Sequence, residues 1–301
     1  MLLLAAVILA AAYLAYRRAF FSPDKVQNDV YNIPRDEQYE PYRAKMIALI
    51  DRLVGERDFE EVSIRSRDGL RLYGRYYHLR DGAPLAIGVH GYRGTAERDM
   101  CGGFQLARAA GQNVLLIDQR AHARSEGHTI TFGIREKLDV CDWVSWARDR
   151  FGEETKILLY GVSMGAATVL LSAPLLEGKI CGIVADSPYS SPREIIEKVS
   201  RDEGLPPRLA WPVIALGARI FGGFSPLGAD VAEAVRESSV PVLIIHGEED
   251  RFVPQEMSAR LTVREGVERR SFPDAGHGIS AILHTEEYNE LVQRFLERCA
   301  K

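Results

Sequence analysis

The sequence predicts an α/β fold in which helices cover both faces of an eight-stranded, mostly parallel sheet, with a small helical lid. Short apolar runs alternate along the chain with helix-compatible stretches such as residues 96–110 and 136–150, an alternation typical of parallel strands joined by helices. The chain opens differently, because Asp68-Gly69 separates two strand-like runs and is a strong hairpin signal. We expect strands at residues 61–66, 70–79, 84–90, 113–118, 156–160, 180–186, 240–246 and 267–272.

Two parts of the chain fall outside this alternation. Residues 187–239 are too long for a crossover built on one helix, and their apolar residues predict a small lid of helices, because loops of such length are usually functional. Residues 22–58 are polar at first and then carry an amphipathic helix at 46–54, packed either on the domain or on a membrane surface. We therefore divide the chain into an N-terminal segment (1–21), a linker with this helix (22–58) and a main domain (59–301).

The N-terminal segment carries a membrane signal. Residues 1–16 are uninterrupted apolar sequence followed by Arg17 and Arg18, and at about 1.5 Å per residue they form a helix slightly shorter than the roughly 30 Å hydrocarbon core. A cleavable signal peptide normally has positive charge ahead of its apolar stretch, and none is present, so we predict an uncleaved anchor. Ala10-Ala11-Ala12 fits a cleavage site, which leaves a processed signal as one alternative and a helix docked on the domain as another. With both arginines on its C-terminal side, the anchor favours a cytoplasmic main domain.

Composition excludes several classes of function. The chain is 46% hydrophobic and 27% charged, as in ordinary globular proteins. The net charge is -4 and the chain has no long run of lysine or arginine, which argues against a nucleic-acid-binding protein. The four cysteines, Cys101, Cys141, Cys181 and Cys299, lie far apart without metal-ligand spacing, so we expect free thiols and neither a metal nor an organic cofactor.

A strand, a tight turn and a helix surround Ser163. Gly161-Val162-Ser163-Met164-Gly165 follows the apolar run 156–160 and precedes a helix-forming stretch. On so sharp a turn the serine hydroxyl is exposed above the sheet, and glycine fits where the strand and helix backbones nearly touch. The motif therefore predicts Ser163 as a nucleophile, with Gly161 and Gly165 required by the turn.

A serine nucleophile requires a base and an orienting acid, and for this type of turn both follow the serine, the acid first. Asp250 lies just after the strand-like run 240–246, at the sheet edge where α/β proteins gather functional groups. Glu248 or Glu249 is the alternative acid. His277 lies between loop glycines after the last strand-like run, so we predict Asp250 as the acid and His277 as the base.

Two backbone N–H groups are expected to bind the negative charge that develops on the substrate oxygen. Met164, directly after the nucleophile, supplies one. Tyr92, in the loop His90-Gly91-Tyr92-Arg93-Gly94-Thr95, supplies the other. The glycines of this loop are equally compatible with an ordinary turn.

With these residues the chain resembles the α/β-hydrolase superfamily, and within it the bacterial membrane-anchored hydrolases related to the lysophospholipase and serine aminopeptidase groups. The resemblance implies the fold, the triad, the oxyanion loop and the lid predicted above. It covers Phe59 to Ala300 and rests on His90-Gly91-Tyr92, residues 118–125, Gly161 to Gly165, Asp250 and His277.

The segment 118–125 departs from the pattern of these relatives. Where they typically have two glycines, this chain has Ala121 and Ala123, so the local loop conformation is not assured. Its charged side chains either line the pocket or, as we favour, form a solvated loop face. These side chains are Arg120, His122 and Arg124.

We expect hydrolysis of a carboxylic ester or thioester through an acyl-serine intermediate, without a cofactor. The anchor and the apolar lid favour an acyl or lipid-like substrate. One alternative is a peptidase or aminopeptidase, for which Glu203, Glu248 and Glu249 are candidate ligands of a substrate amine. The others are a binding protein that keeps the fold without turnover and a membrane-tethered scaffold acting through residues 31–53. The sequence makes no prediction about oligomeric state.

Overall fold

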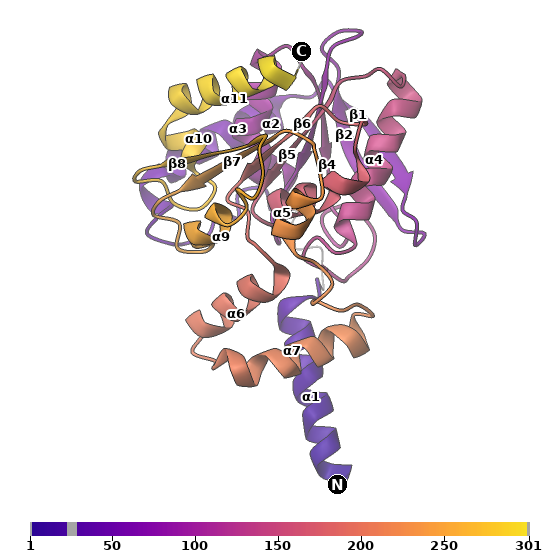
Figure 1. Cartoon of the computed structure of the whole chain (residues 1–301), viewed down its shortest axis with the longest axis vertical. Coiled ribbons are helices and arrows are strands. Elements are labelled where there is room, and N and C mark those ends of the chain that lie inside the picture. The colour runs from indigo at the N-terminus through magenta and orange to yellow at the C-terminus, as the bar shows by residue number, and fades with distance from the viewer. Residues whose placement is uncertain (1, 23–28, 300–301) are drawn as a thin grey trace.

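Eight strands form a single sheet in the order β1-β2-β4-β3-β5-β6-β7-β8 (Figure 1). The structure is a computed structural model that describes residues 2–22 and 29–299. β2 runs antiparallel to β1 and β4, and all other neighbouring strands are parallel, which confirms the predicted fold class. The strands are β1 (Glu60–Arg65), β2 (Arg71–Tyr77), β3 (Leu85–Val89), β4 (Asn113–Ile117), β5 (Ile157–Val162), β6 (Gly182–Asp186), β7 (Val242–Gly247) and β8 (Val267–Phe272).

Helices cover both faces of the sheet. α4, α5 and α8 bury one apolar core against it, and α2, α3 and α11 bury the other, with α2 packed on α3. Strands β3 to β7 lie between the two layers, which explains why their sequences are almost continuously apolar. These helices are α2 (Arg43–Gly55), α3 (Ala96–Ala109), α4 (Glu136–Phe151), α5 (Met164–Ser172), α8 (Val231–Arg236) and α11 (Thr285–Cys299), and the shorter elements are η2 (Glu40–Tyr42), η3 (Ala173–Leu175), α9 (Gln255–Ala259) and α10 (Ser280–Leu283).

The carboxyl ends of the parallel strands meet at one edge of the sheet. The register places Val89 of β3 beside Gly161 of β5 and Val162 of β5 beside Asp186 of β6. Asp186 in turn pairs with Ile245 near the end of β7. The segments that follow these four strands therefore start side by side, as at the functional edge of other α/β sheets.

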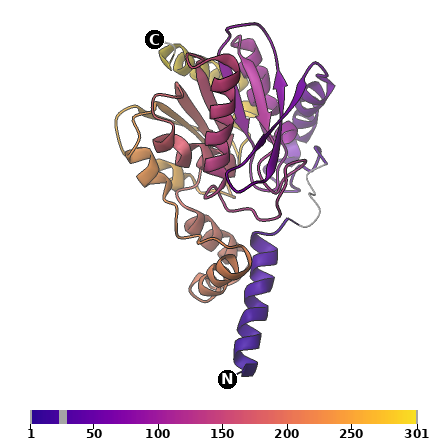
Figure 2. The same ribbon diagram turned by 90° about the vertical axis from the view of Figure 1, so that its right-hand side faces the viewer.

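The N-terminal helix α1 (Leu2–Ala19) projects from the domain, and its C-terminal end is built into the domain (Figures 1 and 2). Phe20 is fully buried, and its carbonyl accepts a 2.8 Å hydrogen bond from Ile130 N. Phe21 forms a β-bridge with Thr129. By length and composition α1 is sufficient to cross a membrane, and most of it is exposed. Residues 23–28 of the predicted linker lie outside the described residues.

The interval 187–239 contains three helices, α6 (Pro192–Asp202), α7 (Pro207–Phe221) and α8. Ser191 caps the start of α6, and Pro207 begins α7 at a position where proline fits the first turn. α8 returns to the layer that covers the sheet. α6 and α7, here called the cap, stand away from the sheet; α6 packs on α7, and α7 lies against α1 (Figures 1 and 2).

Candidate active site

Ser163 lies on a strained turn between β5 and α5. Its φ of 56° is in the left-handed region, which costs a non-glycine residue roughly 1–3 kcal/mol. Its N–H donates a 2.8 Å hydrogen bond to the Asp186 carbonyl. A Cβ at Gly161 would lie 2.5 Å from the Gly165 carbonyl carbon, and one at Gly165 would collide with the Val89 carbonyl oxygen. The close approach of strand and helix therefore requires both glycines and holds Ser163 at the sheet edge.

His277 and Asp250 meet in the loops that follow β8 and β7. The Nδ1 atom of His277 lies 2.7 Å from Oδ2 of Asp250. Oδ1 of the same carboxylate accepts hydrogen bonds from the N–H groups of Phe252 (2.9 Å) and Val253 (2.8 Å), so the carboxylate is fixed from two sides. Because Nδ1 faces the carboxylate, Nε2 is the nitrogen left to exchange a proton.

Of the three acidic side chains weighed after β7, Asp250 is the one in contact with the imidazole. Asp250 is buried, whereas Glu248 and Glu249 are exposed. Glu248 accepts a 2.7 Å hydrogen bond from the Ser271 hydroxyl. His246 lies on the other side of the acid, with its Nε2 3.2 Å from Asp250 Oδ2.

Burial and neighbouring charge shift the pKa values of Asp250 and His277 in opposite directions. Burial favours a neutral Asp250 carboxyl, but the charge of His277 and hydrogen bonds from His246 and His277 outweigh burial and hold the pKa of Asp250 well below its usual range. Burial lowers the pKa of His277, whereas the Asp250 carboxylate and its hydrogen bond raise it by more, so the pKa of His277 lies above its ordinary value. The imidazole is therefore suited to accept a proton while Asp250 stays ionised.

Ser163 and His277 line the same cavity of about 970 Å³. The cavity lies between the sheet edge and the cap, and apolar side chains such as Ile195 and Ile214 line it from the cap. The Ser163 hydroxyl makes no hydrogen bond within the part of the chain that the structure describes, so it is free to turn toward Nε2 of His277. Catalytic hydrogen bonds often tighten when the substrate binds.

The two predicted backbone donors lie next to Ser163. The N–H groups of Tyr92 and Met164 have no acceptor among the described residues, as a site for an oxyanion requires. A Cβ added at Gly91 would lie 3.3 Å from the Ser163 Cβ, so the Tyr92 loop passes directly beside the serine. Gly91 N donates a 2.8 Å hydrogen bond to Asp99 Oδ2, which anchors the loop and leaves Tyr92 N–H free.

Two buried histidines join this loop to the segment 118–125, a role that the sequence analysis did not predict. Nε2 of His122 accepts a 3.0 Å hydrogen bond from Arg93 N, and Nε2 of His90 accepts a 3.1 Å hydrogen bond from Gln119 N. The two rings are fully buried, with centroids 4.8 Å apart. Burial lowers the pKa of both, that of His122 to about 3, so both act as neutral acceptors.

The favoured placement of Arg120 and His122 on a solvated loop face is therefore wrong. Arg120 is buried, and its guanidinium donates hydrogen bonds to Asp139 (2.6 Å) and Asp68 (2.8 Å). Neither Arg120 nor His122 lines the cavity, because each is held by buried hydrogen-bond partners: carboxylates for Arg120, and the Arg93 N–H and the Arg120 carbonyl for His122. Arg124 is exposed, as expected.

Two alanines of the segment 118–125 have left-handed backbone conformations. Ala121 has a φ of 62° and Ala123 a φ of 42°, in the region that glycine enters without steric cost. The loop therefore takes a glycine-like conformation although it lacks both glycines of its relatives.

Residues ahead of the main domain hold the His277 loop. Gln38 Oε1 accepts a 2.8 Å hydrogen bond from His277 N, and the Tyr39 hydroxyl donates to the His277 carbonyl (3.1 Å). On the other side, Gly278 N donates to Ser187 Oγ (3.3 Å). The sequence analysis assigned Gln38 and Tyr39 to a linker, and no local signal marks them, because their partner lies 239 and 238 positions away.

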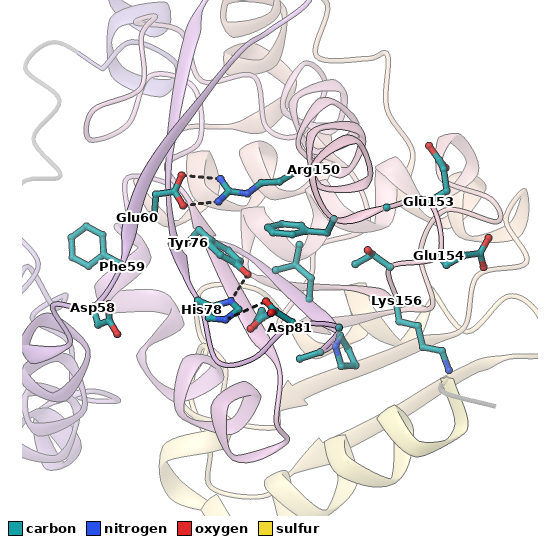
Figure 3. A pocket seen from close by; sticks show the side chains of 18 residues that line it. Asp58, Phe59, Glu60, Tyr76, His78, Asp81, Arg150, Glu153, Glu154 and Lys156 are labelled. Carbon is teal, nitrogen blue, oxygen red and sulfur yellow. Dashed lines mark hydrogen bonds and ion pairs between the residues drawn. The ribbon is translucent and has the colours of Figure 1, made fainter.

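A second cavity, of about 960 Å³, opens at the opposite end of the sheet. Two pairs of polar side chains line it: Arg150 pairs with Glu60 (2.6 Å), and His78 lies 3.6 Å from Asp81 (Figure 3). None of the predicted site residues lines it. Within the described ranges, no group of three or more His, Cys, Asp and Glu side chains is placed to hold a metal ion.

One family model and several known proteins are similar to this chain. The model described as "Alpha/beta hydrolase family" matches residues 86–292. The protein YqkD of Bacillus subtilis is 29% identical over 198 residues, which cover 62% of this chain and 63% of that protein. The thiohydrolase aneE of Aspergillus aculeatus is 28% identical over 57% of this chain and 54% of its own length. Among solved structures, the esterase Pf2001 of Pyrococcus furiosus has a TM-score of 0.64 at 27% identity, covering 80% of this chain and 90% of that chain.

Proposed function

Because the chain belongs to the alpha/beta hydrolase family, we propose that it is a serine hydrolase that cleaves a carboxylic ester or thioester. A fold of this kind serves many activities, so the argument rests on the site. One observation carries the proposal. The strained turn of Ser163 and the imidazole of His277, whose Nδ1 lies 2.7 Å from Asp250 Oδ2, open into one cavity.

The geometry supports a two-step acyl transfer. Ser163 Oγ attacks the substrate carbonyl while His277 Nε2 takes its proton, and Asp250 stabilises the imidazolium that forms. The N–H groups of Tyr92 and Met164 bind the oxyanion, each worth roughly 3 kcal/mol of transition-state stabilisation. His277 then returns the proton to the leaving alcohol or thiol, and a water molecule activated by the same imidazole releases the acid from Ser163.

The cavity supports an acyl substrate. Apolar side chains of the cap line it, and about 970 Å³ is ample for an acyl chain. The names of two similar proteins, an esterase and a thiohydrolase, support the ester and thioester classes. No step of this reaction requires a metal or an organic cofactor.

A peptidase is the second candidate, and the carboxylates of the cavity disfavour it. Asp99, Asp186 and Glu203 line the cavity, but each already has a partner among the described residues. Asp99 pairs with Arg98 (2.6 Å), and Glu203 pairs with Arg18 (2.5 Å). Asp186 accepts hydrogen bonds from Ser187 and Tyr288, and burial raises its pKa. Glu248 and Glu249 do not line the cavity, so the described lining offers no unpaired carboxylate to bind a substrate amine.

We further propose that α1 attaches the enzyme to a membrane. The helix is long and apolar enough to cross a membrane, and its last turn contains Arg17 and Arg18. The positive-inside tendency then favours a main domain in the cytoplasm.

Acyl-chain profiling with Ser163→Ala tests the proposed reaction. We expect p-nitrophenyl esters of increasing chain length to be hydrolysed in preference to aminoacyl p-nitroanilides. Ser163→Ala should lose roughly 10⁴-fold or more of the ester activity. Ser145→Ala, on the outer face of α4, is the matched control and should behave as the wild type.

Two results would contradict the proposal. Ester hydrolysis by Ser163→Ala at the rate of the Ser145→Ala control would exclude Ser163 as the nucleophile. Faster cleavage of anilides than of esters would favour the peptidase.

A further inference from the structure

α1 and the cap form one structural unit. α7 crosses α1 so closely at Gly217 that a Cβ there would collide with the Ala12 carbonyl oxygen. The rings of Tyr13 and Phe221 pack edge to face at 5.1 Å. Together with the Arg18–Glu203 ion pair, these contacts hold the cap against α1 in both views of the molecule (Figures 1 and 2).

Several large apolar side chains of the cap are exposed. Leu209 is 73% exposed and Ile220 49%. Phe221, also exposed, touches Tyr13, which belongs to the exposed apolar surface of α1. Exposed apolar surface that continues over two elements marks an interaction site. We call this set the cap surface: Val199, Leu205, Leu209, Ile220 and Phe221.

The contact between Gly217 and Ala12 determines at which level along α1 the cap lies, and therefore how deep it lies in a membrane that surrounds α1. Ala12 lies seven residues before Ala19, the last residue of α1, which is about 10 Å along a helix. A bilayer that surrounds the exposed apolar residues before Ala12 therefore reaches α7. Interfacial amphipathic helices bury their apolar face by about 5–10 Å into the boundary between headgroups and acyl chains, so this depth fits α7.

The charges of the cap match an anionic lipid surface. Its exposed arginines Arg201, Arg208 and Arg219 have no acidic partner within the described chain. The acidic side chains of α6 are paired, for example Glu197 with Arg193 (2.7 Å) and Asp202 with Lys198 (2.5 Å). The cap therefore presents unpaired positive charge beside its apolar side chains, as in segments that bind anionic lipids.

The cap surface is also the rim of the cavity. Val199, Leu205 and Leu209 are exposed and line the cavity that contains Ser163. A membrane in contact with these three side chains is in contact with the cavity mouth. We propose that α1 and the cap surface insert together into an anionic bilayer, so that the cavity takes its acyl substrate directly from the membrane. The membrane contact stands on the geometry of α1 and the cap, and the substrate route rests on the proposed hydrolase function.

A pair of glutamate variants of the full-length protein tests the substrate route. Ile220→Glu places a charge on the cap surface at a residue that does not line the cavity. Leu79→Glu is its control, because Leu79 is 40% exposed and follows β2 at the opposite end of the sheet. The two substrates are p-nitrophenyl palmitate in vesicles of phosphatidylcholine and phosphatidylglycerol and p-nitrophenyl acetate in solution.

Ile220→Glu should lower palmitate hydrolysis in vesicles about 10-fold, because it removes apolar contact with the membrane and adds repulsion from anionic lipid. It should hydrolyse the acetate like the wild type, and Leu79→Glu should match the wild type on both substrates. Equal palmitate rates for Ile220→Glu and Leu79→Glu would overturn the proposed route.

Fluorescence quenching by brominated phospholipids tests membrane insertion without catalysis. Ile220→Trp should be quenched more strongly than Leu79→Trp in anionic vesicles, because its indole lies among acyl chains. The native tryptophans are common to both variants, so the difference reports the introduced side chain. Equal quenching would overturn the membrane contact. If the wild type hydrolyses neither ester, the proposed function fails, while this measurement still decides insertion.

Discussion

The Arg93 guanidinium donates a 2.9 Å hydrogen bond to the backbone carbonyl of Arg18, in the last turn of α1. The same nitrogen donates to the Phe21 carbonyl (3.2 Å), and the Tyr92 hydroxyl donates to the Ala19 carbonyl (2.8 Å). The last carbonyls of a helix lack intrahelical partners and carry partial negative charge, which a guanidinium neutralises. The loop that contains the proposed oxyanion donor is thus attached to the end of the N-terminal helix.

Loss of this attachment should impair turnover more than substrate binding. We expect Arg93→Met to lower kcat about 10-fold with little change in KM, because displacement of an oxyanion donor acts mainly on the transition state. Arg124→Met, a change at an exposed arginine, is the control and should leave kcat unchanged. Steady-state kinetics together with thermal unfolding separates positioning from misfolding. A rise in KM with unchanged kcat would contradict a positioning role for Arg93.

Asp250→Asn should retain the fold and lose most of the activity. An amide cannot stabilise the imidazolium and favours the wrong tautomer of His277, and such changes lower kcat by roughly 10⁴-fold. Glu249→Gln, next to it and exposed, is the matched control. A kcat of Asp250→Asn close to that of Glu249→Gln would show that another carboxylate orients the histidine.

The pH profile should report the raised pKa of His277. The neutral imidazole is the base, so kcat/KM should rise with pH and reach half its plateau above the ordinary histidine value of about 6.5. In Asp250→Asn the remaining activity should have its midpoint at lower pH, because the charge and hydrogen bond that most oppose the effect of burial on the pKa of His277 are then lost. In the wild type, the raised pKa of His277 also stabilises the folded protein. This contribution is fully present below about pH 6.5 and is lost as the pH rises through the pKa of His277 in the folded state. An unchanged midpoint in Asp250→Asn would contradict the assigned cause.

Ala123→Gly should stabilise the protein. Left-handed backbone costs an alanine about 1–2 kcal/mol, and the added freedom of glycine in the unfolded chain offsets about 0.5–1 kcal/mol of that gain. The net increase in the free energy of unfolding should therefore approach about 1 kcal/mol. Urea denaturation measures it. Ala121→Gly is less informative, because Ala121 is fully buried and its methyl group contributes packing.

Ala232→Gly, inside α8, is the control and should destabilise by about 0.5–1 kcal/mol. A loss of stability in Ala123→Gly of similar size would show that the loop stores no backbone strain at this position.

Periodic and local features of this fold were predictable from sequence. Six of the eight strands follow from apolar runs and the first two from a hairpin signal, and the approach of Gly161 to Gly165 follows from a motif whose chemistry demands it. Contacts that depend on tertiary packing were not predictable. His122 belongs to a polar segment, yet it is buried because Arg93 N and the loop of His90 enclose it. Likewise, Gln38 gains its role from a partner that only the completed fold brings near.

In the N-terminal segment, too, the local structure was predictable from sequence and the tertiary contacts were not. Its length and apolar composition predict a helix, and α1 is one. The contact of Ala12 with Gly217 depends on where the cap folds, and the hydrogen bond from Tyr92 to the Ala19 carbonyl depends on where the Tyr92 loop folds. No sequence periodicity encodes these contacts.

Labelling with a fluorophosphonate, followed by peptide mass spectrometry of the folded full-length protein, tests the central claim most directly. We predict a single adduct on Ser163, absent in Ser163→Ala and strongly slowed in His277→Ala, because the reagent requires a serine activated by a base. A folded wild-type protein that stays unlabelled, or that carries the adduct on another residue, would contradict the account.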